Sequence, residues 1–230
     1  MKIRYWLFGS LSVLYWGVVV WAAVVYSFIS HDVIFLNIQA AQLPRLSHLV
    51  FAQFTATQTL RWDTPTSITR IEIPLYVPSN SEQILIKLYQ NKQLVTWWKY
   101  QAPSSDSGVV LAQLPFIVPT TLSGHIEVML DGSSIPYTES GRAPAFFAEP
   151  QNSVYPNGNY RIASNEKDGD MAMSIIIQKT NLQLYIENFQ RQPLGSLSLL
   201  FIYGCAALLI FYVPILSMRI GAGLVSKRKT

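Results

Sequence analysis

The sequence contains very little cysteine and few charged residues. Cys205 is the single cysteine among 230 residues, so no intrachain disulfide can form, and a small disulfide-bonded scaffold is excluded. Charged residues make up 13% of the chain, against roughly 25% in a typical soluble domain, whereas 50% of the chain is hydrophobic. A chain this apolar is not intrinsically disordered.

The sequence also lacks the motifs of common enzyme classes. Neither a Gly-x-Ser-x-Gly nucleophile elbow nor a Gly-x-x-x-x-Gly-Lys phosphate loop is present. His31, His48 and His125 lie far apart, and we identify no second ligand beside any of them at helical or strand spacing. We therefore expect no catalytic residue, no metal site and no cofactor. A hydrolase or transferase whose acidic residues converge from separate strands is the open alternative.

Two long runs without a charged residue dominate what is present. They cover 25 residues from Tyr5 to Ile29 and 27 residues from Gln192 to Met218. Roughly 20 apolar residues in a helix suffice to cross a bilayer, so we predict two transmembrane helices. The first run is longer than the apolar region of a signal peptide and no Ala-x-Ala site follows it, which favours an uncleaved anchor.

The position of the charges predicts the orientation. Six Lys or Arg and no acid flank the two runs on their outer sides, at residues 2, 4, 219 and 227–229. Basic residues beside spans stay in the cytoplasm, so we expect both termini there and the middle of the chain in the periplasm or outside the cell. The middle carries eleven basic and thirteen acidic residues, a net charge of −2, so a nucleic-acid partner is not expected.

The region between the runs has the pattern of an antiparallel β protein. Eleven of the thirteen prolines fall there, which excludes long helices. Short alternating segments such as Ile71–Leu75, Ile84–Leu88, His125–Leu130 and Met171–Ile177 each predict a strand with one buried face. Asp131-Gly132 predicts a hairpin turn. Further strands are expected at Leu49–Thr57, Leu94–Tyr100, Val109–Val118 and Ala143–Phe147.

These patterns predict a mainly β chain, an antiparallel β-sandwich flanked by two transmembrane helices. The expected parts are an N-terminal transmembrane anchor (1–29), a connector (30–48), an extracytoplasmic sandwich (49–179), a second connector with a helical turn (180–192), a C-terminal transmembrane helix (193–218) and a basic cytoplasmic tail (219–230).

Several segments resemble a known domain family. Gln53-Phe54-Thr55-Ala56-Thr57, the segment Ser67–Ile73, Tyr155-Pro156-Asn157-Gly158 and Gly169-Asp170-Met171-Ala172-Met173 are similar to motifs of a jelly-roll-like β-sandwich found in bacterial membrane and envelope proteins. The similarity covers about 130 residues, with Met171 and Met173 where that family usually has Leu and Phe. The resemblance implies a place in the bacterial inner membrane beside polysaccharide or glycosyltransferase machinery, and a fold similar to carbohydrate-binding modules. It supplies no catalytic residue.

The candidate binding residues are aromatic. Trp97 and Trp98 are adjacent on an expected strand, so they point to opposite faces, and at most one belongs to the core. An exposed ring could stack on a sugar or contact a partner protein. Tyr89 and Tyr100 complete this group. The acidic loop Glu166–Asp170 could hold calcium, but it lacks the ligand pattern of a helix-loop-helix site, and a solvated turn is the favoured interpretation.

Inside the predicted spans, small and aromatic residues are the candidates for helix–helix contacts. They are Tyr15, Trp16, Gly17, Trp21, Gly204 and Ala207. We expect a non-catalytic accessory or scaffold subunit of a larger integral membrane complex, with the lipid bilayer and other membrane subunits as partners. The alternative is a membrane-tethered carbohydrate-recognition module that serves envelope polysaccharide assembly or export.

Overall fold

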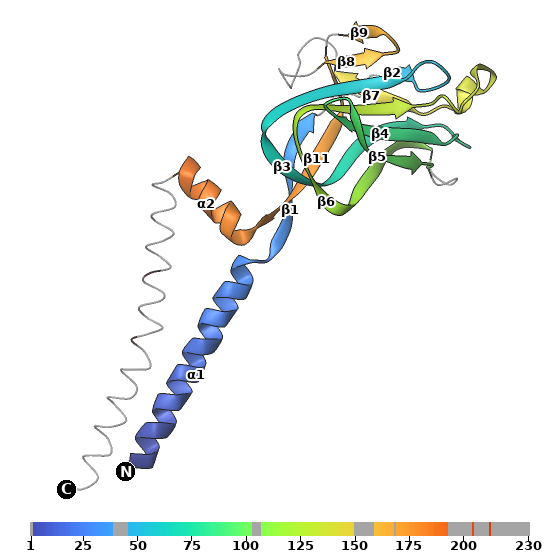
Figure 1. Cartoon of the computed structure of the whole chain (residues 1–230). Helices are drawn as coiled ribbons and strands as arrows, with labels where there is room; N and C mark the ends of the chain where they lie inside the picture. The colour runs from blue at the N-terminus through green and yellow to red at the C-terminus, as the bar shows by residue number, and fades with distance from the viewer. Residues whose placement is uncertain are drawn as a thin grey trace. The chain divides into compact units, whose positions relative to one another are not determined.

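The computed structural model describes residues 2–38, 46–102, 107–149, 159–167 and 169–192, together with 204 and 212. The chain divides into two units, one formed by Met1–His31 with Lys179–Thr230 and the other by Asp32–Gln178. The described elements are α1 (Lys2–Ser27), β1 (Ser30–Ile38), β2 (Leu46–Leu49), β3 (Ala56–Val77), β4 (Ile84–Gln90), β5 (Gln93–Tyr100), β6 (Gly108–Asp131), the 3₁₀ helix η1 (Tyr137–Arg142), β7 (Ala145–Glu149), β8 (Tyr160–Ile162), β9 (Asn165–Lys167), β10 (Asp170–Met171), β11 (Met173–Thr180) and α2 (Asn181–Arg191) (Figure 1).

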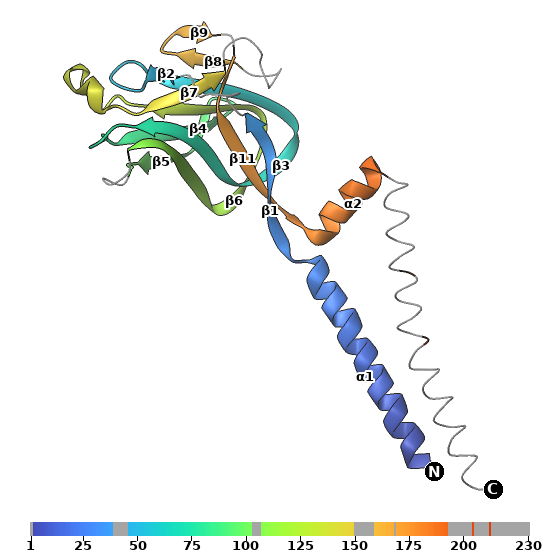
Figure 2. The ribbon, with the colours of Figure 1, turned by 180° about the vertical axis from the view of Figure 1, so that it is seen from behind.

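The strands form an antiparallel sheet, which confirms the prediction of a mainly β chain. The main path of the sheet runs in the order β1-β11-β3-β6-β4-β5. The short strands β2, β7, β8, β9 and β10 attach beside it through β7 and β3. Seen from behind, β1 and β11 lie side by side (Figure 2), so the two strands that lead to α1 and α2 are neighbours in the sheet.

Two long strands, β3 and β6, organise this sheet. They pair along almost their whole length, and both bend strongly (Figure 1). Their register shifts between Trp62 and Thr66 and between Ile68 and Arg70. Pro65 lies in the first irregularity, and Pro115 borders the second, as expected of a residue that cannot donate a ladder hydrogen bond. The prolines therefore mark bends within long strands, where the sequence pattern predicted separate short strands.

The core confirms the predicted alternation. Ile71, Ile73 and Leu75 on β3 are fully buried, as are Ile84, Ile86 and Leu88 on β4, and Ile126, Val128 and Leu130 on β6 are equally buried. Met171, Met173, Ile175 and Ile177 form the expected buried face of β10 and β11, and here Ala172 and Ile176 are buried too. Burial of these aliphatic side chains is the main driving force for folding this unit.

Four segments differ from the expected local structure. The expected strand Leu49–Thr57 is instead the last residue of β2, a tight turn closed by the isolated bridge between Phe51 and Phe54, and the start of β3. Residues 30–38, expected in a connector, form β1, and residues 181–191, expected as a connector with a helical turn, form the helix α2 of three turns. The predicted hairpin turn at Asp131-Gly132 is wrong. β6 ends at Asp131, but its ladder partners are β3 and β4, and η1 comes before the next strand. The dipeptide is a strand terminator, because the Asp131 carboxylate accepts a hydrogen bond from the Ser133 amide at 2.9 Å.

The first predicted span is helical: α1 covers 26 residues, Lys2–Ser27. In the parts of the chain that the structure describes, no helix reaches the combination of length and hydropathy required to cross a membrane. The second predicted span and the basic tail lie outside the described residues, except for Gly204 and Tyr212.

Candidate functional site

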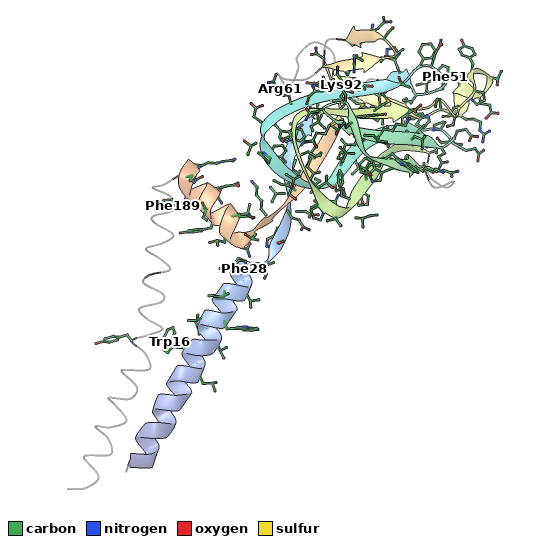
Figure 3. All side chains as sticks on the ribbon, in the orientation of Figure 1. Trp16, Phe28, Phe51, Arg61, Lys92 and Phe189 are labelled. Atoms are coloured by element: carbon green, nitrogen blue, oxygen red, sulfur yellow. The ribbon has the colours of Figure 1, made fainter. Side chains whose placement is uncertain are left out.

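The predicted aromatic group lies on the hairpin formed by β4 and β5. The two strands join through Asn91 and Lys92, whose φ angles are 49° and 68° (Lys92 is labelled in Figure 3). Positive φ at both turn residues is the conformation of a tight type I′ turn, which matches the twist of the flanking strands. The Asn91 side chain accepts a hydrogen bond from the His125 amide at 3.2 Å, which joins the turn to β6.

The hairpin separates the aromatic residues onto two faces. Trp98 and Tyr100 pack against the core. The Trp98 indole N–H donates to the Pro115 carbonyl at 2.9 Å, and its ring meets Phe116 edge to face at 5.2 Å. These contacts make Trp98 part of the packing between β5 and β6.

Trp97 is on the opposite, outer face and 52% exposed. It pairs across the ladder with Lys87, and the Lys99 ammonium lies 5.9 Å from the centre of its ring. Residues at alternate strand positions share a face, so Tyr89 joins this group. We call Lys87, Tyr89, Trp97 and Lys99 the aromatic face. It offers an exposed indole for stacking beside two cationic groups.

Lys87 is fixed by an ion pair on this face. Its ammonium lies 2.6 Å from the Asp131 carboxylate, which is almost buried. Burial alone would raise the pKa of Asp131, but hydrogen bonds from Lys87 and Ser133 outweigh it and lower the pKa below its ordinary value of 3.8. The hydrogen bond to Asp131 raises the pKa of Lys87, against the opposing effect of burial. Both groups are therefore charged at neutral pH.

A second polar cluster lies on β6 a few residues before Asp131, and the sequence analysis did not predict it. His125 Nε2 is 3.0 Å from the Glu127 carboxylate, and Arg161 on β8 approaches the same oxygen at 3.3 Å. The expectation that no second ligand lies beside a histidine at strand spacing was wrong for His125, since residues two apart on a strand share a face. That spacing was visible in the sequence. The contribution of Arg161 was not, because it requires the pairing of β3 with β8.

No group of metal ligands forms among the described residues. Partial burial of its ring, followed by the nearby charge of Lys167, lowers the pKa of His48, although the residue as a whole is exposed, and the ring is neutral near neutral pH. Asp170 of the acidic loop is fully buried, and it accepts a hydrogen bond from the Gln58 side chain at 3.0 Å, while the Met171 amide donates to Gln58 at 2.6 Å. Asp168 lies outside the described residues. The described part of this loop thus connects β10 to β3.

An apolar surface that the sequence reading did not single out lies on β3 and β6. Tyr76 is paired with Val109, and Leu111 lies two residues farther along the same face of β6. Val109 is 63% exposed, and Tyr76 and Leu111 are also exposed. We call these three residues the apolar patch. At the nearby bend of β6, Ile117 and Val118 are also largely exposed. The sequence predicted a strand over Val109–Val118. It did not predict which face of that strand would remain exposed.

The predicted helix-contact residues are only partly described. Tyr15 and Trp21 are exposed on α1, and Tyr15 meets the half-buried Trp16 edge to face at 5.6 Å (Trp16 is labelled in Figure 3). A Cβ at Gly17 or Gly204 would meet no atom within 4 Å, so both glycines have open space beside them. Ala207 lies outside the described residues.

Comparisons with known proteins do not assign the chain to a family. No family model matches it, and a search of curated proteins finds no match.

Proposed function

We propose that this chain is a non-catalytic accessory subunit of a larger integral membrane complex. The two uncharged runs anchor it in a bacterial inner membrane with both termini in the cytoplasm. Its β domain, folded as a jelly-roll-like sandwich, lies on the external side and covers a partner subunit there. The distribution of basic residues around the runs supports this orientation.

The observation that carries the proposal is the apolar patch. Tyr76, Val109 and Leu111 expose apolar side chains on adjacent strands. Contiguous exposed apolar surface on a folded domain is typical of protein–protein contacts. The patch lies beside a stretch of β6, residues 108–114, that pairs only with β3 among the described strands, so its outer edge is available for a further strand.

The chain connectivity supports attachment at two points. β1 follows α1, β11 precedes α2, and these two strands are neighbours in the sheet. A domain with two adjacent connections has less freedom to rotate than one with a single tether. A fixed orientation is useful to a subunit that covers a neighbour, and it is unnecessary for a freely diffusing binding module.

The test is copurification from native membranes in mild detergent. The wild-type chain is expected to migrate with partner subunits after crosslinking, and the double substitution Val109→Glu with Leu111→Glu is expected to release them. Gln113→Glu is the matched control, since Gln113 is an exposed polar residue on the same face of β6. A monodisperse monomer from wild-type membranes would overturn the proposal.

A second function, carbohydrate recognition, is favoured by one observation, the exposed Trp97 ring beside Lys99. Flat aromatic side chains stack on sugar rings at low entropic cost, and the resemblance to envelope sandwich domains points the same way. Under this hypothesis Trp97 and Tyr89 contact the glycan. Trp98 and Tyr100 support the hairpin from its core side.

Binding of envelope polysaccharide fragments to the full chain in lipid nanodiscs tests this second function. Trp97→Ala is expected to abolish binding without a change in folding. Tyr137→Ala removes an exposed aromatic residue outside the hairpin and serves as the control. Equal binding by wild type and Trp97→Ala, or no binding by either, would eliminate the hypothesis.

A further inference from the structure

Helix α2 has an apolar stripe that the described residues leave partly exposed. Leu182, Tyr185, Ile186 and Phe189 follow the spacing i, i+3, i+4, i+7, which places them on one stripe. Leu182, Ile186 and Phe189 are 43%, 47% and 36% exposed, and no residue of the helix is buried. The helix is nevertheless well defined at its start, because Thr180 and Gln183 form a reciprocal capping box.

The start of α2 is attached to the end of α1. The Asn181 side chain donates to the Tyr26 carbonyl at 2.8 Å, and its backbone amide donates to the Ile29 carbonyl at 3.0 Å. The Tyr26 carbonyl, in the last turn of α1, thus accepts from the Asn181 side chain as well as from the Ile29 amide. Phe28 and Ile29 at this junction are exposed (Figure 3 labels Phe28, just after α1, and Phe189 on α2). Exposed apolar residues therefore occur on both sides of the hydrogen bonds made by Asn181.

The charges of α2 suit a lipid headgroup region. Glu187, the only acid of the helix, is neutralised by Lys179 at 2.6 Å. Arg191 occupies the last turn, so the segment Lys179–Arg191 carries a net charge of +1. An amphipathic helix with an apolar stripe and a polar, weakly basic opposite side is typical of a helix that lies in the membrane interface. Its position in the chain agrees, since the 27-residue uncharged run begins at Gln192.

We propose that α2 lies in the headgroup region of the bilayer, with the stripe of Leu182, Ile186 and Phe189 inserted among the lipids. This inference rests on the membrane anchoring of the proposed function. In the chain, the helix then connects the exported domain to the second span along the membrane surface. The hydrogen bonds of Asn181 set the direction in which the helix leaves its contact with α1.

Spin labels report the depth of α2 directly. The full chain with Cys205→Ala is reconstituted in vesicles of phosphatidylethanolamine with a minority of phosphatidylglycerol, and labels are placed through Ile186→Cys, Phe189→Cys or Asn188→Cys. Asn188 is the matched control, because it is exposed and lies outside the stripe. At positions 186 and 189 we expect more frequent collisions with oxygen, which dissolves in lipid, and fewer with a water-soluble nickel complex. At position 188 we expect the reverse.

The outcomes separate this inference from the proposed function. Retention of the chain in the vesicles after an alkaline carbonate wash tests the anchoring, and loss of the chain would overturn both. If the chain is retained but the label at 186 collides mainly with the nickel complex, the stripe faces water and only the inference fails. A label at 186 that neither reagent reaches would show that protein covers the stripe, which also overturns the inference.

Discussion

At the scale of single residues, the pair of Lys87 and Asp131 links β4 to the end of β6 in a mostly buried setting. We predict that Asp131→Asn lowers the free energy of unfolding by about 1–3 kcal/mol, since it leaves the Lys87 ammonium without its anion. Chemical unfolding of the full chain in detergent, followed by tryptophan fluorescence, measures this loss. Glu139→Gln is the control, because the ion pair of Glu139 with Arg142 is solvent-exposed and worth little.

The same pair predicts a dependence on pH. The pKa of Asp131 is lowered in the folded chain, so its stabilising effect is complete above the ordinary value of 3.8 and is lost as the pH falls through the folded value. The pKa of Lys87 is raised, so its effect is complete below 10.5 and is lost as the pH rises through the folded value. The difference in stability between wild type and Asp131→Asn should therefore be constant between these limits. If this difference in the free energy of unfolding changes between about pH 5 and about pH 9, which lie inside the window, another titrating group is responsible.

Gly132 provides a second prediction at this scale. A Cβ built at Gly132 would clash with the Val50 carbonyl oxygen, which is backbone and cannot rotate away. Gly132→Ala is therefore expected to destabilise the fold by about 1–3 kcal/mol, the range found for overpacking. At Gly141 a Cβ would meet nothing within 4 Å, so Gly141→Ala should leave the unfolding midpoint within experimental error. Equal midpoints for the two variants would contradict the close approach of the chain at Val50.

At the scale of elements, α2 depends on its N-terminal cap. Thr180→Ala removes the hydroxyl that accepts from the Gln183 amide at 3.2 Å, and such losses cost about 0.5–2 kcal/mol of helix stability. Hydrogen exchange of the full chain should therefore become faster for the amides of Asn181–Arg191 and remain unchanged in β3 and β6. Thr180→Ser keeps the hydroxyl and should restore slow exchange. Faster exchange in Thr180→Ser to the same degree as in Thr180→Ala would remove the capping box as the cause.

The strands show how far local patterns extend. Alternation identified the buried faces of β3, β4 and β6, because a strand places every second side chain on one side. It did not identify the continuity of β3 through Pro65 or of β6 through Pro115. A proline loses only its own ladder bond, and at a bend the strand tolerates that loss. Whether a strand ends or bends at proline depends on its partner, which a local pattern does not contain.

At the scale of the whole molecule, the proposed orientation predicts opposite accessibility for the middle and the end of the chain. In a Cys205→Ala background, a membrane-impermeant maleimide added outside intact cells should label Ser133→Cys, which replaces an exposed residue after β6. The same reagent should label Ser226→Cys, in the basic tail, only after the inner membrane is permeabilised. Labelling of Ser226→Cys in intact cells would reverse the orientation and remove the basis of the proposed function.

The sequence by itself determined the composition-level properties of this protein: two uncharged runs, an acidic region between them, a mainly β fold for that region and the buried face of most strands. These follow from local periodicity and charge, which act within a few residues. Tertiary structure alone decided that Trp97 is exposed while Trp98 packs on Phe116, that Tyr76 and Val109 form an apolar patch, and that Asn181 binds the end of α1. Each of these features joins residues far apart in sequence or depends on which face a neighbouring strand covers, and only the folded chain fixes those relations.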